Sequence, residues 1–236
     1  MTIDVTKTIP LKDFQKIIGF PHQKKLDEQF HALNIGNMIS VVYWYEFFKM
    51  IQNVPGDVVE CGVGRGRSLL IISALNYFLK GSKKPRKIFA YDSFEGFPSP
   101  TVEDESQRNP KKGEWSKSPS GKYAYSPNFI KSVLSNAYIP TKNIFIKKGF
   151  FSKTLVNHPK RPISILHADG DLFSSTTDIL ESLFDKVSKG GIIVFDDIYL
   201  GNRDFPGAKK AAKKFLGNDY SKLKTSVIGT SYFIKK

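Results

Sequence analysis

Short apolar runs that end in or beside an acidic residue recur along the chain. They show little polar alternation and are rich in β-branched and aromatic residues, which is typical of strands buried on both faces of a parallel sheet. Four of them are "DVVEC" (57–61), "KIFAYD" (87–92), "PISILHAD" (162–169) and "GIIVFD" (191–196). With the shorter "NIFIKK" (143–148), they give five expected strands.

Segments with apolar residues at helical spacing separate these strands. They predict helices over 37–51, 67–79, 127–138, 151–157 and 173–187, and a last helix that Pro206 opens at its first position. The candidate N-caps of the helix at 173–187 are Ser174, Ser175, Thr176 and Thr177. Strands that alternate with helices predict an α/β fold with a doubly wound, mostly parallel sheet. An antiparallel hairpin of strands near 223–228 and 231–235 is expected to end it, with Gly190 and Gly191 ending the connection before the strand at 191–196.

The same spacing predicts which side of each helix is buried. The apolar positions of the helix at 37–51 are Met38, Val41, Val42, Tyr45 and Phe48. Those of the helix at 173–187 are Ile179, Leu180, Leu183, Phe184 and Val187. In the last helix Ala208, Ala211, Ala212 and Phe215 are expected to face the sheet, with Lys209, Lys210, Lys213 and Lys214 in solvent.

The pattern predicts an N-terminal arm over 1–36 and one domain over 37–236. Residues 98–127 interrupt the domain with five prolines and many charged residues. A long stretch without periodicity inside a compact domain is typical of a functional lid or of disorder. The aromatic residues Trp115 and Tyr123 favour a lid that covers an acceptor, although packing within a surface loop would also account for them.

Composition narrows the setting. The chain has 236 residues, of which 40% are hydrophobic, and a formal net charge of +14. A single cysteine, Cys61, excludes an intrachain disulfide. With no apolar leader and no run approaching a membrane span, we expect a cytoplasmic protein without a transmembrane segment. The lysines are scattered, which is typical of a solvated surface rather than a nucleic-acid interface.

Acidic residues follow or end the expected strands. Ligands of doubly wound sheets bind at the carboxyl edge of the strands. There we expect Glu60, Asp92, Asp169, Asp196 and Asp197. Their mutual repulsion would require a cation or a hydroxyl-rich ligand among them.

The first turn, "ECGVGRGRS" (60–68), is rich in glycine. Its spacing departs from the dinucleotide fingerprint because position 67 is arginine, and no Gly-Lys-Ser/Thr follows as in a P-loop. Glu60 before the turn and Asp92 after the next strand suit a nucleoside with free ribose hydroxyls and a cationic tail. S-adenosylmethionine is such a molecule, with Asp92 on the ribose and Glu60 near the methionine end.

The motifs "DVVECGVGRGRS", "AYDSFEGFP", "LHADGDLFSSTTDILESLFDKVSKGG" and "IIVFDDI" together resemble the macrocin O-methyltransferase family of sugar O-methyltransferases. The resemblance runs from about residue 36 to the C-terminus. It implies a class I methyltransferase-like (Rossmann-like) fold with a seven-stranded sheet, and dependence on S-adenosylmethionine and Mg²⁺ or another divalent cation. It also implies Asp169, Asp196 and Asp197 as metal ligands, Asp171 as the general base, and cofactor contacts from Glu60, Gly62, Gly64, Ser68, Asp92 and Ser93.

The resemblance further implies a small hydroxyl acceptor, such as a sugar or glycoside. The basic surface leaves room for an anionic acceptor, such as a nucleotide-linked sugar. His167 shares a strand face with Asp169, so it is a candidate for supporting the site or contacting substrate, or is simply a packed histidine.

Other interpretations stay open at this point. Asp169 and Asp171 precede a helix and could only cap it, and Asp196 and Asp197 could sit in a strand-end turn. A nucleic-acid-binding protein or RNA methyltransferase would use the +14 charge, although nucleic acid is not the favoured partner. A protein that binds the cofactor without catalysis is a third class. The arm at 1–36 is a candidate contact of a homo-oligomer.

Overall fold

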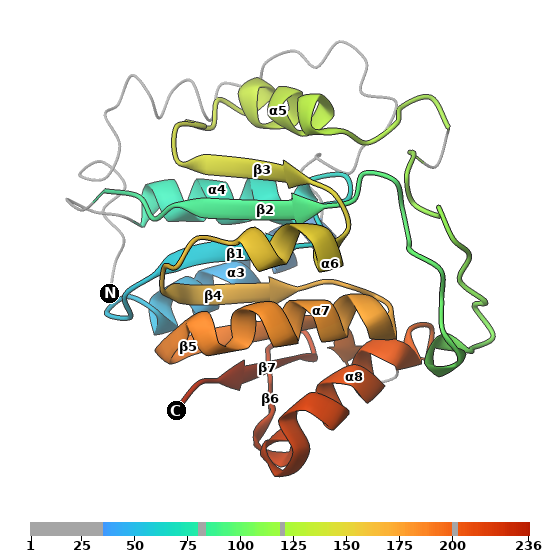
Figure 1. Cartoon of the computed structure of the whole chain (residues 1–236). Helices are drawn as coiled ribbons and strands as arrows, with labels where there is room; N and C mark the ends of the chain where they lie inside the picture. The colour runs from blue at the N-terminus through green and yellow to red at the C-terminus, as the bar shows by residue number, and fades with distance from the viewer. Residues whose placement is uncertain (1–34, 80–83, 119–120, 200–202) are drawn as a thin grey trace.

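The computed structural model describes residues 35–79, 84–118, 121–199 and 203–236. Strands and helices alternate along the chain (Figure 1). The strands are β1 (Asp57–Cys61), β2 (Ile88–Asp92), β3 (Ile144–Lys148), β4 (Ile163–Ala168), β5 (Val187–Tyr199), β6 (Lys224–Thr225) and β7 (Thr230–Ile234). The α-helices are α3 (Ile35–Met50), α4 (Arg67–Phe78), α5 (Pro127–Asn136), α6 (Phe151–Thr154), α7 (Phe173–Leu183) and α8 (Pro206–Leu216). Short 3₁₀ turns are η2 (Val102–Asp104), η3 (Leu155–Asn157), η4 (Phe184–Lys186) and η5 (Gly217–Lys222).

The sheet has seven strands in the order β3-β2-β1-β4-β5-β7-β6. The first five strands of the chain pair in parallel, and β7 is antiparallel to both β5 and β6. This arrangement confirms the doubly wound sheet and its closing hairpin. The order reverses at β1, which lies between β2 and β4, so the carboxyl ends of β1 and β4 flank the point where doubly wound sheets bind ligands.

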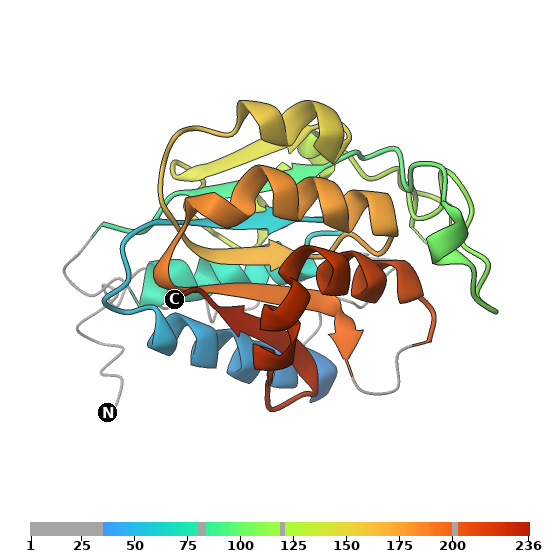
Figure 2. The same ribbon diagram turned by 60° about the horizontal axis from the view of Figure 1, so that its bottom comes forward.

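Helices cover both faces of the sheet (Figures 1 and 2). One apolar cluster packs α3, α4 and α5 against side chains such as Val58 and Ile88. The other packs α7 and α8 against side chains such as Val59 and Phe89. Neighbouring strand residues therefore point into opposite cores, which is why the strand sequences read as continuous apolar runs rather than alternating ones.

Helix α3 buries a different face from the one its spacing predicted. The side chains of Met38, Val41 and Val42 are 40–54% exposed. The buried residues of the helix are instead Tyr43, Trp44 and Phe47, and of the predicted positions only Phe48 is buried as expected. An aromatic side chain removes more surface from water than valine does, so the cluster of rings, which meet edge to face, determines the helix orientation.

Three smaller expectations about element ends were also wrong. Phe215 of α8 is 37% exposed and contacts Phe184, while Leu216 is buried. Gly190 and Gly191 lie inside β5, which begins at Val187 and pairs there with the start of β4. The strand expected near 223–228 is only Lys224–Thr225. The predicted arm lies outside the described residues as far as residue 34.

Segment 98–127 has local structure of its own. It contains η2 and a bridge between Lys117 and Ala124. Its η2 turn packs on α8, where Lys210 Nζ donates a hydrogen bond to the Glu103 carbonyl. Ser106 Oγ also donates to the Asp204 carbonyl, so this long connection is tied to the start of α8. Among the helices of the described ranges, none is long and apolar enough to cross a membrane.

Candidate active site

A cavity of about 930 Å³ opens at the carboxyl edge of the sheet. Its walls come from the turn after β1, the ends of β2, β4 and β5, segment 98–127 and the first turns of α6 and α7. This volume is at the upper end of the range for small-molecule sites, about 300 to 1,000 Å³. It has room for two small molecules side by side.

The glycine turn is pressed against the end of β4. A Cβ on Gly62, whose φ is +100°, would lie 1.9 Å from the Asp169 carbonyl oxygen, so only glycine fits there. Asp169 N–H in turn donates to the Cys61 carbonyl at 2.9 Å. At Gly64 an added Cβ would meet nothing within 4 Å, because this backbone faces the cavity.

Asp92 holds this turn in place. Its Oδ2 accepts hydrogen bonds from Val63 N–H at 2.9 Å and Gly64 N–H at 2.8 Å. Its Oδ1 accepts one from Phe94 N–H at 2.6 Å. Asp92 also lines the cavity, so the side chain predicted to contact a ribose lies where it can, while it organises the loop that would surround the cofactor.

Five of the six predicted cofactor contacts line the cavity: Gly62, Gly64, Ser68, Asp92 and Ser93. Glu60 does not. It is fully buried inside β1 with its Oε1 3.3 Å from Nδ1 of His167, so the expectation that it lies at the open edge was wrong. The physical reason is register, because Glu60 lies beside His167 on the neighbouring strand, one position before each strand ends.

Four aspartates converge at the ends of β4 and β5. Oxygen atoms of Asp169, Asp171 and Asp197 lie within 4.8 Å of one another, and atoms of His167, Asp169 and Asp196 form a second such group. Asp169 belongs to both. The predicted ligand set of Asp169, Asp196 and Asp197 is thus divided between two overlapping groups, with Asp196 half-exposed and Asp197 buried.

Burial and neighbouring charges give the four aspartates different pKa values. Burial, together with the nearby carboxylates, raises the pKa of Asp169 and Asp171 well above the ordinary value. The same causes raise the pKa of Asp197 to about 7. Burial opposes ionisation of Asp196 most strongly, but the hydrogen bond to His167 and the charges of His167 and Arg67 together outweigh it and lower the pKa of that carboxyl. Such a cluster favours a bound proton or cation.

Asp171 has an unusual backbone. Its φ is +56°, a left-handed conformation that asparagine and aspartate tolerate better than most residues. Its N–H donates to Asp197 Oδ2 at 2.8 Å, which ties the turn after β4 to the end of β5. Non-glycine residues in this conformation concentrate at functional sites.

Neither Asp169 nor Asp171 caps α7, and the serine and threonine N-cap candidates were also wrong. The helix begins at Phe173, and the N-cap residue Leu172 offers no side-chain hydrogen bond. Asp104 from η2 accepts the Phe173 N–H at 2.7 Å instead. This cap comes from about 70 residues away in the chain, so no local pattern could indicate it. The structure thus gives neither Asp169 nor Asp171 a capping hydrogen bond to the first turn of α7.

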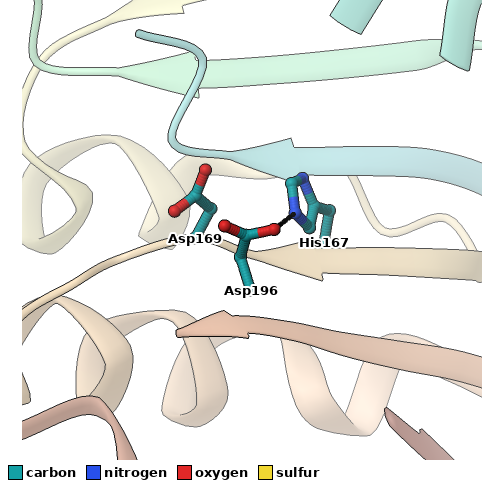
Figure 3. A group of neighbouring side chains, drawn as sticks. All are labelled: His167, Asp169 and Asp196. Atoms are coloured by element: carbon teal, nitrogen blue, oxygen red, sulfur yellow. Dashed lines mark hydrogen bonds and ion pairs between the residues drawn. The ribbon is translucent and has the colours of Figure 1, made fainter. Parts of the chain in front are cut away.

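His167 lies between Glu60 and Asp196, and Figure 3 shows the side facing Asp196. Its Nε2 is 3.5 Å from Asp196 Oδ1, and its Nδ1 faces Glu60. Burial alone would lower the pKa of His167, but the hydrogen bonds to Asp196 and Glu60 raise it well above its ordinary value. The ring of Trp44 meets the imidazole edge to face, with centroids 4.8 Å apart.

A group of aromatic residues forms another part of the cavity wall. Phe97, Trp115 and Phe205 all line the cavity, and the guanidinium of Arg108 lies 5.1 to 5.9 Å from the three ring centroids. Trp115 is 55% exposed, so its ring is available to a ligand. Tyr123 is absent from the lining residues and contacts Phe129 instead, so of the two predicted aromatic contacts only Trp115 reaches the cavity.

Several of these residues escaped sequence reasoning. Arg108 and Phe205 stand in no motif, and Phe97, although it lies within "AYDSFEGFP", had no assigned role. Only folding brings Phe205 to the other two. Asp104 and the Glu60–His167 pair were missed for the same reason. Cross-strand register could have indicated the pair, because Glu60 and His167 each stand one residue before the end of adjacent parallel strands.

The sheet order, the glycine turn after β1 and the acids at the carboxyl edge define a class I methyltransferase-like α/β fold. The solved structure of the calicheamicin methyltransferase CalS11 has a TM-score of 0.74 to this chain at 22% identity, covering 95% of this chain and 91% of that one. The solved structure of the O-methyltransferase NovP has a TM-score of 0.68 to this chain at 26% identity, covering 83% of this chain and 79% of that one.

The family model described as Macrocin-O-methyltransferase (TylF) matches residues 48–228, and the chain belongs to this family. A demethyldecarbamoylnovobiocin O-methyltransferase of Streptomyces niveus is 31% identical over 146 residues, which cover 62% of this chain and 54% of that protein. A rhamnosyl-tetracenomycin-C 4'-O-methyltransferase of Streptomyces olivaceus is 30% identical over 149 residues, covering 63% and 55%. The chain thus spans about half the length of the curated relatives it matches.

Proposed function

We propose that this protein is an S-adenosylmethionine-dependent O-methyltransferase that acts on a hydroxyl of a sugar or glycoside. The observation that carries the proposal is the convergence of four aspartates on the cavity that the glycine turn borders. The family supports the reaction, and the names of three relatives, on rhamnosyl-tetracenomycin, a novobiocin precursor and mycinamicin III, support a sugar-bearing acceptor.

The cavity residues fit both S-adenosylmethionine and a divalent cation. The backbone at Gly64 faces open space in the cavity, and Ser68, Asp92 and Ser93 also line that cavity. These groups suit a nucleoside, whose hydroxyl groups they can hydrogen-bond. Crowded carboxylates with raised pKa values suit a divalent cation, which prefers oxygen ligands. We place the cation with Asp169, Asp196 and Asp197.

The residues of the cavity would have different roles in the methyl transfer. A bound cation would act as a Lewis acid that lowers the pKa of the acceptor hydroxyl. Asp171 accepts the hydroxyl proton as the oxygen takes the methyl group, a role that requires a carboxylate close to the acceptor but not coordinated to the cation. Trp115, with segment 98–127 as a lid, excludes water and supports the acceptor ring.

The cavity's charge argues against an RNA substrate. Acidic lining residues outnumber basic ones in spite of the net charge of the chain. The acidic ones are Asp92, Glu114, Asp169, Asp171, Asp178, Asp196 and Asp197, and the basic ones are Arg65, Arg67, Lys117 and Lys153. Such a lining attracts a cationic cofactor and repels a polyphosphate chain.

The test combines binding with turnover. Isothermal titration should show S-adenosylhomocysteine binding to the full chain, and methyl transfer should appear on at least one of the three relatives' acceptors when Mg²⁺ is present. Asp169→Ala should abolish transfer, whereas Asp185→Asn, at a fully exposed site remote from the cavity, should not. Absence of S-adenosylhomocysteine binding, or unchanged transfer by Asp169→Ala, would contradict the proposal.

A further inference from the structure

The imidazole of His167 is held in one orientation by its buried surroundings. Its side chain is 1% exposed, Glu60 faces Nδ1 at 3.3 Å, and the Trp44 ring meets it edge to face. A carboxylate that accepts the Nδ1 hydrogen fixes the tautomer in which the Nε2 lone pair is free. In proteins, a histidine that ligates a metal commonly donates its other N–H to a carboxylate in this way.

That Nε2 is directed at the aspartates (Figure 3). It lies 3.5 Å from Asp196 Oδ1, which is long for a hydrogen bond to a carboxylate. Two ligand atoms about 2.1 Å from one ion would lie about 3.0 Å apart at an octahedral angle and about 3.4 Å apart at a tetrahedral one, so a small shift of either side chain brings both to one ion. The ligand atoms of His167, Asp169 and Asp196 all lie within 4.8 Å of one another, and the half-exposed Asp196 gives an ion access from the cavity.

We infer that His167 supplies a nitrogen ligand to the divalent cation, beside Asp169 and Asp196, with Glu60 as the residue that positions it. The inference rests on the cation of the proposed function and adds its chemical class. An all-carboxylate site suits Mg²⁺, whereas imidazole favours ions of the Mn²⁺ to Zn²⁺ series. A proton on Nε2 competes for the same lone pair, so binding of the ion displaces it.

The experiment reads the ligand directly rather than through activity. The full chain is loaded with Mn²⁺, and its electron spin echo spectrum is recorded for modulation from a directly bound imidazole nitrogen. Mn²⁺ and Mg²⁺ affinities are measured on the same samples by titration. We expect nitrogen modulation that changes when the protein is made with isotope-labelled histidine. In His167→Gln the modulation should vanish and Mn²⁺ affinity should fall about tenfold or more, with a smaller loss for Mg²⁺.

His158→Gln is the matched control. His158 is the other histidine in the described part of the chain, and it contacts Phe89 and Tyr91 rather than the aspartates. It should keep the nitrogen signal and the ratio of the two affinities. Should His167→Gln fail to fold, the labelled His158→Gln sample still tests the inference, because the absence of a histidine nitrogen signal there would overturn it.

The outcomes separate this inference from the function on which it rests. Tight Mn²⁺ binding without a histidine nitrogen signal would overturn the inference alone and leave the carboxylate site in place. Binding of neither Mn²⁺ nor Mg²⁺ would remove the cation from the proposed function and this inference with it. An unchanged affinity ratio in folded His167→Gln would also overturn the inference.

Discussion

At the scale of single residues, position in the cluster distinguishes acids of the same type. Asp196 faces His167 and has a lowered pKa, whereas Asp171 meets Asp197 and has a raised one. Asp171 also stands on a left-handed backbone that lifts it out of the β4 strand direction. One carboxylate is thereby suited to hold a cation and the other to take a proton, although both follow apolar strands.

The role of Asp171 predicts a kinetic effect without a binding effect. Asp171→Asn keeps the shape and the backbone hydrogen bond to Asp197 but removes the base. We expect the turnover number to fall about 100-fold or more while S-adenosylhomocysteine affinity stays unchanged. Radiolabelled methyl transfer and calorimetry measure the two, with Asp185→Asn as the control. A variant with wild-type turnover would exclude Asp171 as the base.

A second residue-scale prediction concerns stability and pH. Burial, with a smaller effect of Lys186, lowers the pKa of His158 from 6.5 to about 4. The unfolded chain therefore takes up the proton first, so this histidine stabilises the fold above pH 6.5 and loses that contribution as pH falls toward 4. The contribution is about 1 to 3 kcal/mol.

Urea unfolding of wild type and His158→Gln across this pH window measures the effect. The difference between the two free energies of unfolding should shrink as the solution is acidified, since glutamine does not titrate. Taking the difference removes the opposite slopes of the aspartate cluster. A constant difference would show that His158 is protonated equally in both states.

At the scale of elements, the start of α7 depends on two distant segments. Asp104 of η2 accepts the Phe173 N–H, and a Cβ on Gly207 of α8 would lie 1.8 Å from Asp104 Oδ1 and 2.7 Å from Phe173 N. The three elements thus meet at a contact with no space for a methyl group. Because α7 begins two residues after Asp171, this contact also fixes the turn that presents the base.

This contact predicts coupled stability effects. Asp104→Ala removes the cap and should cost about 1 to 2 kcal/mol of unfolding free energy. Gly207→Ala overpacks the contact and should cost about 1 to 3 kcal/mol. In the double variant the added methyl has more room. The double variant should therefore lose less unfolding free energy than the sum of the losses in the two single variants. Chemical denaturation of all four proteins measures the coupling, and strict additivity would contradict it.

At the scale of the whole molecule, charge is unevenly distributed. The chain carries +14, yet seven acids and four basic residues line the cavity. Among the described residues, helices such as α8 carry exposed lysines on the outer surface, whereas the sheet gathers carboxylates at one edge. Binding to the outer surface and binding in the cavity should therefore depend differently on the salt concentration.

This difference is measurable. Affinity for a single-stranded RNA probe, followed by fluorescence polarisation, should be weak and fall steeply as salt rises, because it depends on surface lysines. S-adenosylhomocysteine affinity, followed by calorimetry in the same buffers, should change by less than about threefold, since the cavity screens its contacts. Tight RNA binding that persists at high salt would instead favour the nucleic-acid alternative.

Local sequence determined much of the architecture. The apolar strands, the helices between them and the closing hairpin follow from patterns of a few residues, because both faces of a parallel sheet must be buried and a helix repeats every few positions. The sequence also predicted the acidic residues that end these strands and the glycine turn after the first of them. Parallel strands place their carboxyl ends at one edge, so most of the candidate site was predictable before any contact was known.

Tertiary structure decided what depends on contacts between distant segments. The orientation of α3 followed from its rings and not from its spacing, the cap of α7 came from η2, and Glu60 turned inward to His167 because of strand register. Packing also decided that Trp115 lines the cavity and which aspartates lie close together. A sequence specifies which side chains are available, whereas distances of a few ångström between them arise only when separate elements are packed together.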